Sequence, residues 1–220
     1  MKKLTALFMG CMMITASLAS CGDSDDGDSK SSKKKSDPLA GSWKMEDEES
    51  GMELVMVFDD GKMDMEMDLS PALKFEGEDF ILSGENVGSD YVSFEDDNLV
   101  VDLQGMEVVN MKCEEKTGDN YDGTYTDLGG LMFDSLGEEM GEEMMGYAKV
   151  RIEDGSFILQ FNDVCDYEIE DDDTVMLKNP PASLVGEDGK TEAEMTYKVD
   201  GDKLDLTNDE GETETLTKVK

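Results

Sequence analysis

The chain has 220 residues, and its 55 acidic side chains outnumber 19 basic ones, which gives a net charge of −36 without a single histidine. So acidic a chain does not neutralise phosphates, which excludes a nucleic-acid partner. Without imidazole there is no Ser-His-Asp triad, no histidine base and no histidine-ligated zinc. The high charge, with 38% hydrophobic residues, favours disorder by itself, so the local pattern must decide whether the chain folds.

Residues 1–20 have the composition of a secretory signal peptide. Lys2 and Lys3 form a positive start, and an uncharged, mostly apolar stretch follows over residues 4–18. This stretch is too short for a membrane-spanning helix, which takes about 20 residues. It runs into Leu-Ala-Ser-Cys at 18–21, which resembles the lipobox of bacterial lipoproteins. The resemblance implies cleavage after residue 20 and a diacylglycerol thioether on Cys21, which is the predicted lipidation site.

Two acyl chains on one residue hold a protein stably at a membrane. The sequence therefore predicts a chain that is lipid-anchored on the extracytoplasmic face of a bacterial cell envelope. Residues 21–37 form the next segment, and after Cys21 they are only Gly, Asp, Ser and Lys. Because this segment has no apolar side chain to bury, it is predicted to be a disordered tether.

The rest of the chain reads as two tandem repeats, predicted at 38–117 and 118–220. The segments that correspond are 41–43 with 123–125, 54–61 with 148–155, 63–67 with 157–161, and 91–103 with 197–207. Because all four features keep their order, the two stretches are interpreted as copies of one unit.

The elements of each repeat are predicted to be short antiparallel strands. Residues 62–69 alternate strictly between charged and apolar side chains, which is the period of a half-buried strand. Asp-Gly at 60–61 and at 154–155 predicts tight hairpins, because type I′ turns need positive φ at both central residues. With about eight short strands expected per repeat, the pattern predicts an all-β fold of two tandem small antiparallel β-barrels or sandwiches.

One amphipathic helix is predicted near 130–146, inserted in the second repeat. Its apolar residues recur every four positions and its acidic residues fill the other side. Three interpretations of its methionines stay open: a face packed on a barrel, a pliable surface for a partner protein, and a soft Cu(I) site. Packing is the preferred one, since neither histidine nor cysteine is near; no metal site is predicted.

The Gly-x-Trp opening, the short hairpins and the closing Tyr-x-Val-x-Gly-Asp-x-Leu at 197–204 resemble the lipocalin-like (calycin-type) domains of bacterial lipoproteins. The resemblance covers both repeats. It implies two copies of a small β-barrel whose interior holds an apolar ligand, with Trp43 and Tyr125 plugging the barrel base. In that family an arginine stacks on the tryptophan, whereas the only arginine here, Arg151, lies in the other repeat.

Two further groups of residues were considered for chemistry. Cys113 and Cys165 lie one in each repeat, and the sequence leaves open whether they form a disulfide or remain buried thiols. The acidic clusters are interpreted as solvated surface rather than as the carboxylate pair of a glycosidase, which needs a cleft with stacking aromatics. These clusters lie at 46–49, 168–173 and 209–214.

The predicted function is a non-enzymatic, membrane-anchored binding module, with a small apolar ligand as one candidate. The alternative is a structural or interaction lipoprotein that uses its acidic surface and Met-rich helix around filled, ligand-free barrels. The predicted partners are the membrane, through the anchor, and either a small ligand or a protein. No catalytic residue and no cofactor is predicted, and the pattern does not identify ligand-binding residues.

Overall fold

The computed structural model of the chain describes residues 37–46, 51–118, 120–181, 191–208 and 211–220. The predicted signal peptide, Cys21 and the tether up to residue 36 lie outside the described residues. Asp37, the last residue of the predicted tether, accepts hydrogen bonds from the backbone N–H of Leu39 at 2.8 Å and from the Tyr167 hydroxyl. The described structure therefore begins where the tether was predicted to end.

Within these described residues, sixteen strands form one antiparallel sheet, and two short helices accompany it. In the first half they are β1 (Gly41–Glu46), β2 (Glu53–Asp59), β3 (Lys62–Asp68), β4 (Leu73–Glu76), β5 (Asp79–Leu82), β6 (Glu85–Gly88), β7 (Val92–Glu95), β8 (Asn98–Asp102) and β9 (Glu107–Lys116). In the second half they are β10 (Gly123–Gly129), α2 (Leu131–Met140), α3 (Glu142–Met145), β11 (Ala148–Glu153), β12 (Ser156–Ile169), β13 (Thr174–Lys178), β14 (Glu192–Asp200), β15 (Lys203–Thr207) and β16 (Thr213–Lys218).

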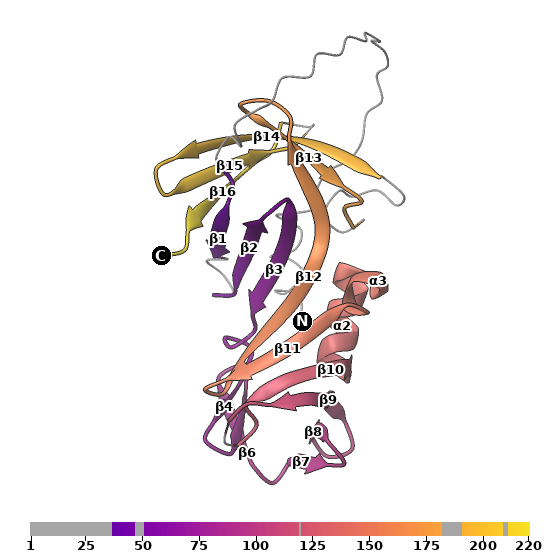
Figure 1. Ribbon diagram of the computed structural model, residues 1–220. Coiled ribbons are helices and arrows are strands. Elements are labelled where there is room, and N and C mark those ends of the chain that lie inside the picture. The colour runs from indigo at the N-terminus through magenta and orange to yellow at the C-terminus, as the bar shows by residue number, and fades with distance from the viewer. Residues whose placement is uncertain (1–36, 47–50, 119, 182–190, 209–210) are drawn as a thin grey trace.

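Strand pairing divides the sheet into two lobes that share the long strand β12 (Figure 1). In one lobe, eight strands pair in a closed ring, in the order β1-β2-β3-β12-β13-β14-β15-β16 and back to β1. In the other, the order β6-β5-β4-β12-β11-β10-β9-β8-β7 is open, because no pairing joins β6 to β7 in the described structure. We call these two parts the ring and the open lobe.

The prediction of an all-β, antiparallel protein is confirmed, but the strands do not form two separate barrels. Strands from 38–117 pair with strands from 118–220 in both lobes, through β1–β16, β3–β12 and β9–β10. Each lobe therefore combines the first three strands of one half with the later strands of the other. The alternating pattern of a strand determines which face is buried, and it does not determine which strand lies beside it.

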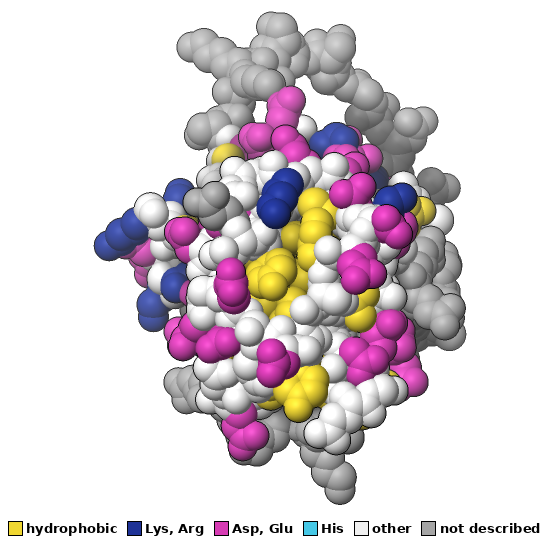
Figure 2. Space-filling view, turned by 90° about the horizontal axis from the view of Figure 1, so that it is seen from below, with side chains coloured by type: hydrophobic (Ala, Val, Ile, Leu, Met, Phe, Trp, Pro, Cys, Tyr) yellow, Lys and Arg dark blue, Asp and Glu magenta, His cyan; other side chains and the backbone are white. Residues whose placement is uncertain are grey.

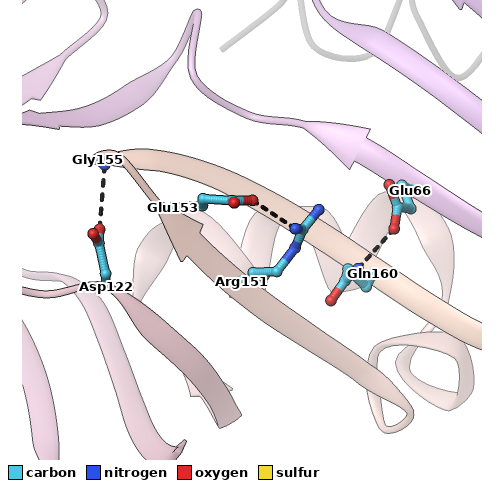
Figure 3. Close-up of polar contacts among 6 residues, drawn as sticks. All are labelled: Glu66, Asp122, Arg151, Glu153, Gly155 and Gln160. Carbon is cyan, nitrogen blue, oxygen red and sulfur yellow. Dashed lines mark hydrogen bonds and ion pairs between the residues drawn. The ribbon is translucent and has the colours of Figure 1, made fainter. Parts of the chain in front are cut away.

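The two lobes nevertheless use the same pairing register. Corresponding pairs are Trp43–Met56 with Tyr125–Val150, Trp43–Lys218 with Tyr125–Cys113, and Leu204–Leu216 with Leu99–Met111. Where β3 meets β12, Glu66 pairs with Gln160, the residue that corresponds to it in the other half. The Gln160 side-chain amide donates to Glu66 at 2.7 Å across this junction (Figure 3). Residue pairs that correspond in the sequence thus also correspond in strand register.

One hydrophobic core runs through both lobes, and its largest fully buried side chains are the two predicted plugs. Trp43, in the ring, donates its indole N–H to the carbonyl of Leu39 at 2.7 Å. Tyr125, in the open lobe, donates its hydroxyl to the carbonyl of Tyr121 at 2.5 Å. Each partner precedes its aromatic residue by four positions, so both buried polar atoms are satisfied in the same way. Burial raises the pKa of Tyr125 well above its usual value.

The local predictions for strands and turns are confirmed. Met63, Met65 and Met67 of β3 are at most 2% exposed, while the charged residues between them point away from the core. The two Asp-Gly turns have φ values of 46° and 82° at 60–61 and of 51° and 79° at 154–155, as type I′ turns require. Strand pattern and turn chemistry therefore overcome the disorder that composition alone favours.

Candidate functional site

The main candidate site is a cleft of about 750 Å³ in the open lobe, between the two helices and strands β10 and β11. Its volume lies within the roughly 300–1,000 Å³ range of small-molecule sites. The lining residues are Thr126, Asp127, Leu128, Phe133, Asp134, Gly137, Glu138, Met145, Gly146, Tyr147, Ala148 and Lys149.

The cleft exists because β10 and β11 separate sooner than their counterparts in the ring. β1 and β2 stay paired beyond Trp43, through Lys44–Val55, Met45–Leu54 and Glu46–Glu53. β10 and β11 pair only as far as Tyr125–Val150. Beyond Tyr125, β10 also shifts its register against β9, and Asp127 takes a positive φ of 50°. A local bulge of this kind re-aims the strand and opens space beside it.

The helices cover this opening, and their apolar side joins the core as predicted. Phe133, Leu136 and Met140 of α2 are at most 2% exposed, and Met144 of α3 is 7% exposed. The predicted single helix is divided at Gly141, which has φ 94°. Met132 and Phe133 were both expected on the apolar side of this helix; Phe133 is buried, whereas Met132 is only half-buried.

The floor of the cleft is apolar and its rim is acidic. Phe133 and Ala148 are buried at the base, and Met145 is half-buried beside them. Asp127, Asp134 and Glu138 are exposed on the rim, and within the described residues no ion pair or hydrogen bond engages their carboxylates. The one lysine of the lining, Lys149, is neutralised by an ion pair of 2.7 Å with Glu114 on β9. The rim therefore presents uncompensated negative charge.

A second, smaller cleft of about 340 Å³ lies where the β11–β12 turn meets β4. Tyr121 stacks on Phe75 there, with ring centroids 4.3 Å apart, and burial raises the pKa of Tyr121. The Gly155 N–H donates to Asp122 at 3.4 Å, and nearby the Arg151 guanidinium pairs with Glu153 at 2.6 Å (Figure 3). The only arginine of the chain is thus held by an acid of its own strand.

The far end of the open lobe exposes apolar side chains. Figure 2, seen from this end, shows a strip of hydrophobic side chains bordered by acidic ones. Tyr91, after β6, is 36% exposed and Met106, after β8, is 49% exposed. The Lys116 ammonium lies 5.2 Å from the centre of the Phe94 ring. In the described structure, helices α2 and α3 line the 750 Å³ cleft and do not cover this end.

The structure holds Cys113 and Cys165 apart and buries most methionines of the helical region away from the cleft. Cys113 and Cys165 are free thiols, one against Tyr125 in the open lobe and one against Met63 at the ring. Burial raises the pKa of both, that of Cys165 to about 12, so neither is a reactive thiol at neutral pH. Of the methionines considered for Cu(I), Met140 and Met144 are buried in the core and only Met145 reaches the cleft.

Within the ring, the sequence pattern does not predict a cation–π contact between Lys218 and Trp43. The Lys218 ammonium lies 4.9 Å from the centre of the Trp43 ring, because β16 pairs with β1 at these two residues. A cation over an indole face is favourable, by about 0.5–1 kcal/mol at exposed sites. The cation over Trp43 is therefore a lysine from β16, in the other half of the chain, and not an arginine of the first repeat.

Comparison with protein-family models, with curated proteins and with solved structures finds no match to this chain. In the described part of the chain, neither helix has the length and apolar character that membrane crossing requires. Across the same ranges, no three Asp, Glu or Cys side chains are grouped so as to hold a metal ion.

Proposed function

We propose that the protein is a lipid-anchored binding module on the extracytoplasmic face of a bacterial cell envelope, and that it is not an enzyme. Its anchor is Cys21, and its ligand site is the cleft between the helices and the β10–β11 opening. The single observation that carries the binding role is this cleft. The equivalent β1–β2 hairpin of the ring stays paired where β10 and β11 separate, so the fold of the strands does not require the cleft.

Charge supports the proposed orientation. Residues 22–37, between the anchor and the body, carry four lysines and five aspartates and are almost neutral, whereas residues 38–220 carry nearly all of the acidic side chains. An anionic membrane surface therefore repels the body far more strongly than the tether. The body is therefore held away from the membrane, with its cleft accessible to solutes.

The site is proposed in the cleft rather than inside the ring because the ring interior is filled by side chains. Trp43 and Leu204 have no exposed surface, and Met65, Met67 and Leu216 are at most 2% exposed. An eight-stranded ring is either filled by its own inward side chains or holds one small ligand, and the burial of these side chains favours the filled form.

A second candidate function is a structural or interaction lipoprotein of the lipocalin-like type, formed from two equivalent units that exchange strands. The same filled ring favours it, together with the acidic exterior. Mass spectrometry of native protein distinguishes the two functions. A bound small molecule in the purified protein supports the binding module, whereas protein that stays empty across a metabolite extract supports the interaction protein.

The anchor is tested with two cysteine variants expressed in a bacterial host. Cys21→Ser should move the protein from the membrane to the soluble fraction and abolish the mass added by the lipid. Cys11→Ser is the matched control, because residue 11 lies in the segment predicted to be cleaved. It should leave the protein membrane-bound. Membrane residence of the Cys21→Ser variant would overturn the anchor.

A further inference from the structure

The cleft in the open lobe is a departure from the internal equivalence of the two halves. The hairpins β1–β2 and β10–β11 share their register up to Trp43 and Tyr125, so this register does not require the helices. The connection between β1 and β2 takes residues 47–52, whereas that between β10 and β11 takes residues 130–147 and contains both helices. Comparison with the ring therefore shows that a hairpin of this register forms without helices in its connection. The separation of β10 from β11, the two helices and the cleft are features that the open lobe has beyond this shared hairpin.

The walls of the cleft combine apolar and aromatic surface with free negative charge. Buried Phe133 and half-buried Met145 form an apolar, polarisable base. Tyr147 on the rim is 72% exposed, the highest value among the large hydrophobic side chains described. An exposed ring beside a cleft has little to pack against in the free protein, and a ligand would give it a partner.

The charges around this base select a cation. The rim carboxylates of Asp127, Asp134 and Glu138 come from β10 and α2, on either side of the opening, and they have no cationic partner among the described residues. An anion is repelled by them. A bare metal ion does not fit either, because within the described ranges no three acidic side chains converge on one point.

Resting on the proposed binding function, we infer that the cleft binds a small organic cation with an apolar body, such as an aryl- or alkylammonium compound. The apolar body covers Phe133 and Met145, and the ammonium lies among the rim carboxylates. Tyr147 and the Met145 thioether supply the cation–π and soft contacts that such cations favour. The charge of the ligand and the acidic rim are complementary, so attraction also increases the rate of encounter.

The test uses the full chain with Cys21→Ser, which removes the lipid without touching the cleft. Benzyltrimethylammonium is the probe, and benzyl alcohol is the neutral comparison, with binding measured by calorimetric titration at fixed ionic strength. We expect the cation to bind at least about tenfold more tightly than the neutral compound, since several rim carboxylates and an exposed ring contribute. Equal affinity for the two probes, or no binding of the cation, would overturn the inference.

Two charge-matched double variants show where the cation binds. Asp134→Asn with Glu138→Gln removes two carboxylates from the cleft rim. Glu194→Gln with Asp200→Asn removes two exposed carboxylates from β14 of the ring. The first pair should weaken binding of the cation about fivefold or more, and the second should leave it within about twofold. Equal weakening by both pairs would mean non-specific attraction to an acidic protein and would refute the site. The membrane-fraction result for Cys21 is independent of either outcome.

Discussion

Gly61 and Gly155 occupy the same position in two hairpin turns, and each faces the backbone of another strand, but only at Gly155 is that backbone too close to leave room for a Cβ. Their φ values are +82° and +79°, so alanine at either position costs about 1–2 kcal/mol for the left-handed conformation. A Cβ on Gly155 would lie 2.3 Å from the carbonyl oxygen of Phe75 on β4. On Gly61 the nearest atom would be the Tyr167 carbonyl oxygen at 3.5 Å, an ordinary contact. The pair therefore separates the cost of the turn from the cost of the close approach.

Relieving this approach requires β4 and the β11–β12 turn to move apart by about 1 Å. That movement strains the hydrogen bond from the Phe75 N–H to the Gly155 carbonyl at 2.8 Å. It also disturbs the stacking of Phe75 on Phe157, whose ring centroids are 5.4 Å apart. Forcing extra volume into a packed site costs about 1–3 kcal/mol, so Gly155→Ala should lose about 2–5 kcal/mol in total and Gly61→Ala about 1–2 kcal/mol.

The measurement is urea unfolding of both variants and the parent, followed by far-ultraviolet circular dichroism. The lower midpoint for Gly155→Ala at an unchanged m-value would report the additional loss of folding free energy. Equal destabilisation by the two alanines would refute the reasoning, because the turn alone would then account for both. A changed m-value would instead mean that the variant exposes a different amount of surface on unfolding or no longer unfolds in two states.

Two further predictions concern the thiols and the junction of β3 with β12. Burial raises the pKa of Cys165 to about 12, so its thiolate is scarce at pH 8 and iodoacetamide should label it more slowly than half-buried Cys113, with a rate that rises with pH. In denaturant without reductant both cysteines should label completely, and incomplete labelling in the mass spectrum would show a disulfide. Gln160→Glu should cost about 1 kcal/mol at pH 7, because two carboxylates then face each other across β3 and β12. Equal urea midpoints for variant and parent at pH 7 would contradict it.

Local chemistry could be predicted wherever neighbouring residues decide the structure. The alternation in 62–69 predicted the buried methionines of β3, since a strand places every second side chain on one face. The two Asp-Gly turns and the helical region at 130–146 were predicted for the same reason. The amphipathic period placed Phe133, Leu136, Met140 and Met144 on the apolar side, and all four are buried, whereas Met132 of the same predicted side is only half-buried.

Neither the cleft nor its charges could be predicted as a site. Asp127, Asp134 and Glu138 stand in a chain with 55 acidic residues, so nothing in the pattern distinguishes them from the solvated surface. The contact of Lys218 with Trp43 could not be predicted either, because 175 positions separate the two residues and only the pairing of β16 with β1 brings them together. Such contacts arise when strands distant in sequence become neighbours.

The sequence by itself determined local structure: the alternating strands, their buried faces and the two Asp-Gly turns. Only the tertiary structure decided that β3 pairs with β12 and that each lobe combines strands of both halves. The physical reason is that backbone hydrogen-bonding groups are the same on every strand edge, so a strand pattern does not specify its neighbour. When two halves have matching faces and registers, strands of one can complete the other with the same local contacts. The choice is then made by the chain connections and by the packing of one shared core.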